Sequence, residues 1–182
     1  MVEAVAQSGI VAQSRRGSFG NNWWARRWEQ AFTSYGTDSR LSRGKSYARS
    51  GQQSLQIERG KVSAKVQGTR RTPYQCVLEM AAFSREEAEA VVEVLREAPT
   101  VVADLLSGEF PEDLKTVFLT AGTWLFPEGW AELEMECSCP DWANPCKHVA
   151  AVAFLLTEQF DRDPWQYLLF RGITQEELLR WL

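Results

Sequence analysis

Three of the four cysteines and the only histidine of this 182-residue chain fall within twelve residues, from Cys137 to His148. The spacing C-x-C-x(6)-C-x-H supplies three thiols and one imidazole. Sulfur and nitrogen donors in this number form a complete tetrahedral set for Zn²⁺ and leave no position for water. We therefore expect Cys137, Cys139, Cys146 and His148 to hold a structural zinc ion, which can stabilise a fold by about 10 kcal/mol or more.

The cysteine cluster is also compatible with roles that need no metal. A disulfide is disfavoured by a reducing compartment and by the poor geometry of a Cys137–Cys139 pair. A redox sensor and buried inert thiols are further alternatives. A nucleophilic Cys–His pair would need a third group to orient the histidine, and none is apparent. The fourth cysteine, Cys76, alternates onto the inner face of an expected strand and is interpreted as a core residue.

The residues around the cluster predict a strand, a knuckle and a helix. Residues 131–137 alternate between apolar residues and glutamates, which predicts a half-buried strand with an acidic solvent face. Asn144 and Pro145 are typical of an N-cap and a first helical residue. Cys146 is then expected in the first turn of the helix, where the helix dipole favours the thiolate.

The periodicity of the whole chain predicts an α+β fold with an N-terminal helix and small antiparallel sheet, a helical midsection and a C-terminal strand-knuckle-helix zinc finger. The four expected segments are 1–20 as a mobile leader, 21–80 as a basic helix plus antiparallel sheet, 81–126 as the helical midsection, and 127–182 as the zinc finger with the C-terminal helices.

The segment 21–80 carries three more detailed predictions. Trp24, Trp28, Phe32 and Tyr35 form an apolar stripe that predicts a short helix. Residues 36–53 contain three glycines and four serines and are expected to form a loop. Alternation over residues 55–66 and 74–80 predicts a hairpin and a third antiparallel strand. Farther along, capping boxes are expected where helices start, and they comprise Ser84 with Glu87 and Thr174 with Glu177.

Charge divides the chain into a basic and an acidic half. Residues 1–75 contain thirteen Lys or Arg against four Asp or Glu, a net charge of +9, whereas residues 76–182 carry −13. Basic residues interleaved with aromatic ones are typical of surfaces that bind polyanions with exposed bases. The alternative is that the basic face docks on the acidic half or on an acidic partner. The candidate nucleic-acid-binding residues are Arg26, Arg27, Arg40, Arg43, Lys45, Arg49, Arg70 and Arg71, with Trp23 and Tyr47 for stacking on an unpaired base.

Several function classes are disfavoured. The longest apolar run, Val149 to Leu156, is too short for a membrane span, and no secretory signal is visible, so a cytoplasmic location is expected. Gly44-Lys45-Ser46 lacks the leading glycine of a phosphate-binding loop, since Ser39 stands in its place. The adjacent carboxylates Glu112 and Asp113 lie where a helix is expected to start, so they are interpreted as groups that interact with the helix dipole and not as catalytic acids.

The motif from Cys137 to His148, followed at once by a hydrophobic helix, resembles the SWIM-type zinc finger over about residues 131–160. The resemblance implies the same four metal ligands, DNA binding or protein contact, frequent association with a helicase-like ATPase, and no known catalytic activity. A softer likeness to bacterial stand-alone SWIM proteins rests on residues farther upstream, which are Arg43-Gly44, Tyr47, Gly51, Gly60-Lys61-Val62, Ala64, Val66, Gly68 and Tyr74.

The resulting hypothesis is a non-enzymatic zinc-binding adaptor that binds DNA, or RNA, through its basic half and couples to a helicase-like ATPase or another protein. The acidic strand with Glu132, Glu134 and Glu136 would repel phosphates, so the zinc region is expected to face a protein partner. The alternative is a pure protein-protein interaction subunit. No membrane and no small-molecule substrate are expected.

Overall fold

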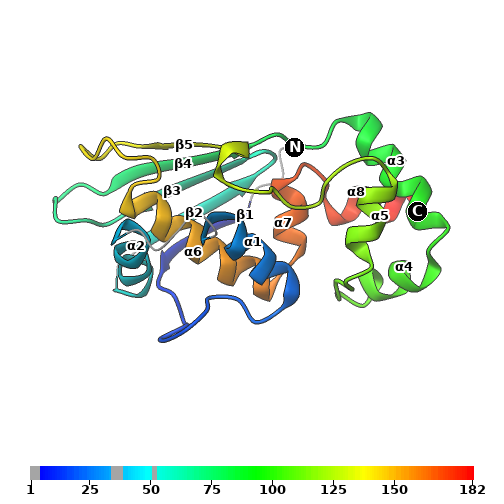
Figure 1. Ribbon diagram of the computed structural model, residues 1–182, viewed down its shortest axis with the longest axis horizontal. Coiled ribbons are helices and arrows are strands. Elements are labelled where there is room, and N and C mark those ends of the chain that lie inside the picture. Colours follow the sequence, from blue (N-terminus) through cyan, green and yellow to red (C-terminus); the bar gives the residue numbers. More distant parts are fainter. Residues whose placement is uncertain (1–4, 34–38, 51–52) are drawn as a thin grey trace.

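A five-stranded antiparallel sheet in the order β1-β2-β3-β4-β5 is the centre of the fold (Figure 1). The computed structural model describes residues 5–33, 39–50 and 53–182. The predicted α+β class is confirmed. The strands are β1 (Val5–Ile10), β2 (Gln53–Glu58), β3 (Lys61–Val66), β4 (Tyr74–Met80) and β5 (Leu133–Cys137).

Helices cover one face of this sheet and extend beyond one of its ends (Figure 1). Alternate residues of β2 to β4, together with Leu133 and Met135 of β5, point toward the helices and are buried, whereas Gln56, Lys65, Gln75, Glu134 and Glu136 are exposed. The helices are α1 (Trp23–Thr33), α2 (Ser39–Ser50), α3 (Arg85–Arg96), α4 (Pro99–Leu106), α5 (Leu114–Thr120), α6 (Lys147–Arg162), α7 (Trp165–Phe170) and α8 (Gln175–Trp181), with a 3₁₀ turn, η1 (Trp130–Glu132), before β5.

Helix α6 is the central element of the core. Every residue from His148 to Phe160 is buried, because α1 and α2 pack on one side of the helix and β3, β4 and β5 on the other. A helix that is apolar nearly all round requires such complete coverage. The residues that follow the metal-ligand motif therefore anchor it in the middle of the molecule.

Helix α2 corrects the prediction of a loop over residues 36–53. Gly44 and Ala48 are buried against α6, and a Cβ added at Gly44 would lie 2.6 Å from the Cβ of Ala150. The helix was missed because its contact face is made of small residues, among them a glycine that usually signals a break. Tyr35 and the remainder of the expected loop at 36–38 and 51–52 lie outside the described residues.

The expected mobile leader over residues 1–20 is wrong for residues 5–10, which form β1 and pair antiparallel with β2. The segment after β1 is held by carboxylates of α6. Glu158 accepts the backbone N–H groups of Gln13 and Ser14 at 2.9 and 2.6 Å, and Asp161 accepts those of Asn21 and Asn22 at 3.0 and 2.7 Å. Residues 1–4 lie outside the described residues.

The sheet also joins segments that were expected to be separate. The predicted β2–β3 hairpin is present with Gly60 at its turn, where φ is +70°. Strand β4 follows as predicted, but β5 then pairs with β4 and extends the sheet from the zinc-finger segment. One hydrophobic core runs through all of these elements.

The midsection is helical as predicted and lies beyond one end of the sheet (Figure 1). Both predicted capping boxes are present, at Ser84 with Glu87 and at Thr174 with Glu177. Pro99 is the first residue of α4, a position that proline favours. Among the described residues, every helix is too short or too polar to cross a membrane.

Candidate metal centre

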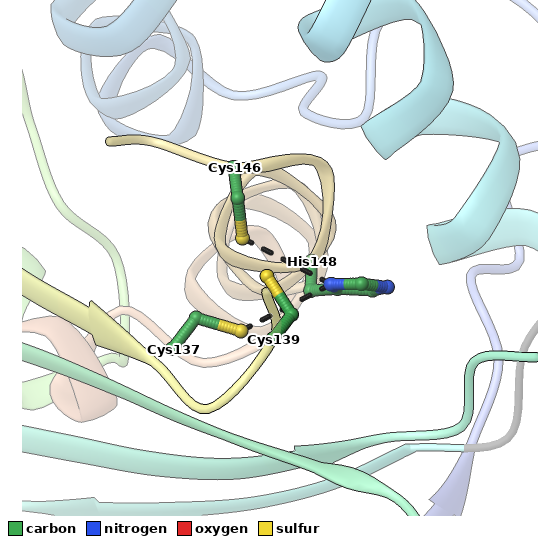
Figure 2. Close-up of side chains that lie close together, drawn as sticks. All are labelled: Cys137, Cys139, Cys146 and His148. Carbon is green, nitrogen blue, oxygen red and sulfur yellow. Dashed lines mark hydrogen bonds between the residues drawn. The ribbon is translucent and has the colours of Figure 1, made fainter. Parts of the chain in front are cut away.

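Cys137, Cys139, Cys146 and His148 come together at one end of the sheet. One ligand atom from each residue lies within 4.8 Å of the others, and the three sulfur atoms and one imidazole nitrogen converge (Figure 2). The Nδ1 atom of His148 lies 3.9 Å from the Sγ atoms of both Cys137 and Cys146. This arrangement of three soft sulfurs and one nitrogen fits a tetrahedral metal ion of the zinc type.

Each ligand is placed by a different piece of local structure. Cys137 ends β5. Cys139 lies in the knuckle, which is the segment of residues 138–145 between β5 and the N-cap of α6. Cys146 is the N-cap of α6, and its Sγ accepts the N–H of Val149 at 3.5 Å. His148 then lies in the first turn of α6. The strand-knuckle-helix arrangement predicted for the motif is thus observed.

The prediction of Asn144 as N-cap and Pro145 as first helical residue is wrong, because the helix begins after Cys146. Asn144 has another role. Its Nδ2 donates to the carbonyl oxygen of Met135 at 2.7 Å, which ties the end of the knuckle back to β5. The thiol of Cys146 takes over the capping that an asparagine side chain would provide.

Crowding and burial make all three thiols hard to ionise. The Cys146 thiol lowers the pKa of Cys137 by hydrogen bonding, but the Cys76 thiol and burial outweigh it and raise that pKa to about 12. The neighbouring Cys137 thiol and burial raise the pKa of Cys146 to about 11. Burial raises the pKa of Cys139. The expected easy ionisation of Cys146 is therefore wrong for the metal-free thiols, and a dication is the group that would stabilise three adjacent thiolates.

Aromatic rings enclose the imidazole of His148. The ring of Tyr74 lies 4.5 Å from it and the ring of Tyr47 5.1 Å, measured between centroids. The Nε2 atom is buried and has no hydrogen-bond partner among the described residues. A Cβ added at Gly68 would lie 2.5 Å from the Tyr74 ring and 3.4 Å from Nε2, so only glycine fits beside this ring. The histidine is thus held in place with Nδ1 toward the sulfurs.

Residues 117–156 match the family model of the SWIM zinc finger. This segment is similar to the SWIM zinc finger. The match includes all four cluster residues, and the resemblance drawn from the motif is confirmed. Four residues of the softer upstream likeness also belong to this centre, since Gly44 packs on α6 and Tyr47, Gly68 and Tyr74 surround His148. Gly51 lies outside the described residues.

The chain is similar to "Uncharacterized protein Rv2102" of Mycobacterium tuberculosis (strain ATCC 25618 / H37Rv), with 45% identity over 174 residues. The alignment covers 95% of this chain but 63% of that relative, so the chain spans less than two thirds of the relative's length. No solved structure matches this chain.

Some of the predicted nucleic-acid-binding residues lie next to the metal centre. Arg40 is the second residue of α2, and its guanidinium lies 5.6 Å from the ring of Trp142 in the knuckle. Arg43 is exposed one turn later on the same helix. Arg70 and the exposed Arg71 lie in the β3–β4 loop, and Arg70 is 5.7 Å from the Tyr74 ring that covers His148.

Two of the cationic residues predicted to bind nucleic acid also make contacts within the fold. Arg49 donates from Nε to the carbonyl of Ser14 at 2.9 Å and from an Nη atom to that of Gly17 at 3.0 Å. Lys45 is half-buried over the ring of Phe154, at 5.1 Å. On α1, Arg26 is exposed and Arg27 half-buried, and neither contacts the metal centre.

Neither aromatic residue predicted to stack on a base presents a free ring. The indole N–H of Trp23 donates to the carbonyl of Phe110, and Lys115 lies 4.7 Å from its ring. Tyr47 packs edge to face on His148, with Lys147 at 5.1 Å. The sequence predictions missed Trp142, which is 89% exposed. The sequence did contain a signal for this exposure. Trp142 is a large aromatic residue between two cysteines of the motif, in a segment without the periodicity of a strand or helix that would predict a buried position.

Proposed function

We propose that this chain is a non-enzymatic zinc-dependent adaptor that binds nucleic acid through the end of the molecule where its metal centre lies. We call this region the zinc-end surface and define it as Arg40, Arg43, Arg70, Arg71, Trp142 and Lys147. The observation that carries the proposal is that Arg40 of α2 lies beside Trp142 of the knuckle, while Arg70 of the β3–β4 loop lies beside Tyr74, whose ring packs on His148. A cluster of cations beside aromatic rings suits phosphates and bases.

The distribution of charge supports this location. Glu134 and Glu136 lie on the open face of the sheet, because Leu133, Met135 and Cys137 alternate toward the helices. These glutamates therefore repel phosphates from the open face of the sheet and not from the face that the helices cover. The ligands, α2 and the knuckle lie on the helix side (Figures 1 and 2), where the arginines can meet a polyanion.

The metal would act on structure rather than on a reaction. Four protein ligands leave a tetrahedral ion no position for substrate or water. The knuckle contacts α2 through Arg40 and Trp142, and His148 contacts the β3–β4 strands through Tyr74. A bound zinc ion would therefore fix the relative positions of the three segments that carry the zinc-end surface.

Salt-dependent binding tests the proposal. Affinity of the zinc-loaded chain for a fluorescent DNA oligonucleotide is measured at several salt concentrations by anisotropy. Each phosphate contact on duplex DNA contributes about 0.9 to the slope of log affinity against log salt, and about 0.7 on a single strand. Arg43→Ala with Arg71→Ala should reduce the slope by about 1 to 2 units. The control is Arg85→Ala, which removes an exposed arginine of α3.

Absent binding, or binding that ignores salt, would rule out this function and leave the second candidate, a protein-interaction subunit. That candidate is favoured by three large apolar side chains exposed away from the metal centre. Leu106, Leu119 and Trp124 are 61%, 54% and 61% exposed. These three side chains could serve as apolar anchors for a protein partner, such as the helicase-like ATPase expected from the resemblance. The adaptor role also requires a contact of this kind, in addition to nucleic-acid binding.

A further inference from the structure

Trp142 is a large apolar side chain that the fold leaves in solvent. It is 89% exposed, the highest value among the exposed large hydrophobic residues described. A side chain of this size usually contributes about 150 Å² or more of buried surface to a core. Here it contributes to neither the core nor the ligand set. Exposure of the indole to water therefore forgoes the stabilisation that its burial would give, and a binding role would explain why the side chain is exposed.

The position of Trp142 is well defined by its neighbours. It lies between two metal ligands, Cys139 and Cys146, in a knuckle whose Asn144 is bonded to β5. Asp141 accepts the N–H of Ala143 at 3.1 Å, which stiffens the turn around it. A bound metal would fix both ends of this knuckle. The indole is consequently presented on a supported loop and would lose little freedom on binding.

One cation lies beside the exposed ring, and two more lie on the helices that adjoin the knuckle. The guanidinium of Arg40 lies 5.6 Å from the ring centroid and also forms a 3.9 Å ion pair with Asp141. Arg43 lies one turn farther along α2, on the same side as Arg40, and Lys147 begins α6 just after the knuckle. An exposed indole with an arginine beside it matches what an unpaired nucleotide offers, namely a flat base and a phosphate.

We infer that Trp142 is a stacking platform for an unpaired base of single-stranded DNA, with the neighbouring arginines on the adjacent phosphates. This inference rests on the proposed function and adds to it the form of the ligand. Bases in a duplex are stacked on each other and cannot cover an indole without being flipped out. The ring should therefore favour single strands.

The test measures affinity for three probes of about 12 nucleotides, a length within the range that one single-strand site covers. They are an oligodeoxynucleotide without self-complementarity, the same strand in a duplex, and its ribonucleotide counterpart. Trp142→Ala should weaken binding of the single DNA strand about 10- to 100-fold, the range of one base–aromatic stack. Trp142→Phe should restore most of the affinity, and the control Trp124→Ala, exposed elsewhere, should not change it.

The outcomes separate the inference from the proposed function. Salt-dependent binding of the DNA strand that Trp142→Ala leaves unchanged would overturn the stacking site and retain the function. Equal losses for single strand and duplex would also overturn it, because a duplex offers no unpaired base. Tighter binding of the ribonucleotide, with the same dependence on Trp142, would overturn the assignment to DNA. Binding of no probe would overturn the proposed function itself.

Discussion

The Sγ atoms of Cys76 and Cys137 lie 3.5 Å apart, because the two residues face each other across β4 and β5. Cys76 is buried, and its thiol is placed to donate to the Cys137 sulfur when that sulfur binds a metal as a thiolate. The fourth cysteine is therefore more than a core residue, since it contacts a metal ligand from outside the motif. Hydrogen bonds to a ligand from a neighbouring group orient the ligand and tune its affinity for the metal.

Replacement of Cys76 by alanine is predicted to weaken zinc binding about 10-fold while leaving one zinc per chain, because a donor to the Cys137 sulfur is lost but all four ligands remain. Competition with a chromogenic chelator measures the affinity. Cys76→Ser keeps a small hydrogen-bond donor and is the matched control. Its zinc affinity is expected to lie between those of the wild type and Cys76→Ala. A loss of zinc stoichiometry in Cys76→Ala would contradict the prediction, since it would make Cys76 a ligand.

The metal site could be predicted because its ligands are close in sequence, and the capping boxes for the same reason. The contact between Cys76 and Cys137 could not, because it depends on the pairing of strands that are far apart in the chain. Strand β1 was missed because VAQSGI contains glycine and alanine, which are depleted in strands, together with serine and glutamine and no regular apolar alternation, and it forms a strand by pairing with β2. Helix α2 was missed because its burial depends on α6.

Removal of the metal is predicted to loosen one end of the molecule selectively. With a chelator, deuterium uptake should rise in the knuckle, in α2 and in the β3–β4 loop, because these segments contact the ligands or the rings around His148. Uptake in α3 to α5, beyond the other end of the sheet, should change little. Cys146→Ser should give the same pattern without chelator. A uniform increase over the whole chain would contradict a local effect.

Arg49 and Arg43 lie on the same helix and are predicted to have opposite effects. Arg49→Ala should lower the free energy of unfolding by about 1 to 2 kcal/mol, because two charge-assisted hydrogen bonds to the segment after β1 are lost. Arg43→Ala should leave stability nearly unchanged, since the side chain is exposed, and should weaken nucleic-acid binding. Urea denaturation of both variants measures the first effect. Equal stability of the two variants would show that Arg49 does not hold this segment.

The close approach of α2 and α6 predicts that Gly44→Ala is destabilising although alanine is the better helix former. The added Cβ would lie 2.6 Å from that of Ala150 and 3.1 Å from its backbone carbonyl carbon, so the helices must separate. Overpacking of this kind costs about 1 to 3 kcal/mol. Thermal or urea unfolding measures the loss. Ser46→Ala is exposed on the same helix and should be neutral or slightly stabilising, and a stabilised Gly44→Ala would contradict the packing.

The start of α3 predicts a pH dependence that belongs to one carboxylate. Glu87 accepts the backbone N–H of Ser84 at 2.8 Å and the hydroxyl of Thr123 at 3.0 Å. Hydrogen bonding from the Ser84 backbone, followed by that from Thr123, outweighs burial and lowers the pKa of Glu87 below its ordinary value of 4.5. The ionised form is thus favoured in the folded state. Its stabilisation is present above the unfolded pKa and is lost as pH falls through the lowered folded pKa.

Glu87→Gln should therefore reduce stability at neutral pH and flatten the decline of stability as the pH falls below the ordinary glutamate value of 4.5 and the wild-type carboxylate takes up its proton. Urea unfolding at a series of pH values measures both effects. Glu86→Gln, on the neighbouring exposed residue of the same first turn, is the control, since it changes the same net charge without the hydrogen bonds. Parallel pH profiles for wild type and Glu87→Gln would show that this carboxylate gains nothing from the cap.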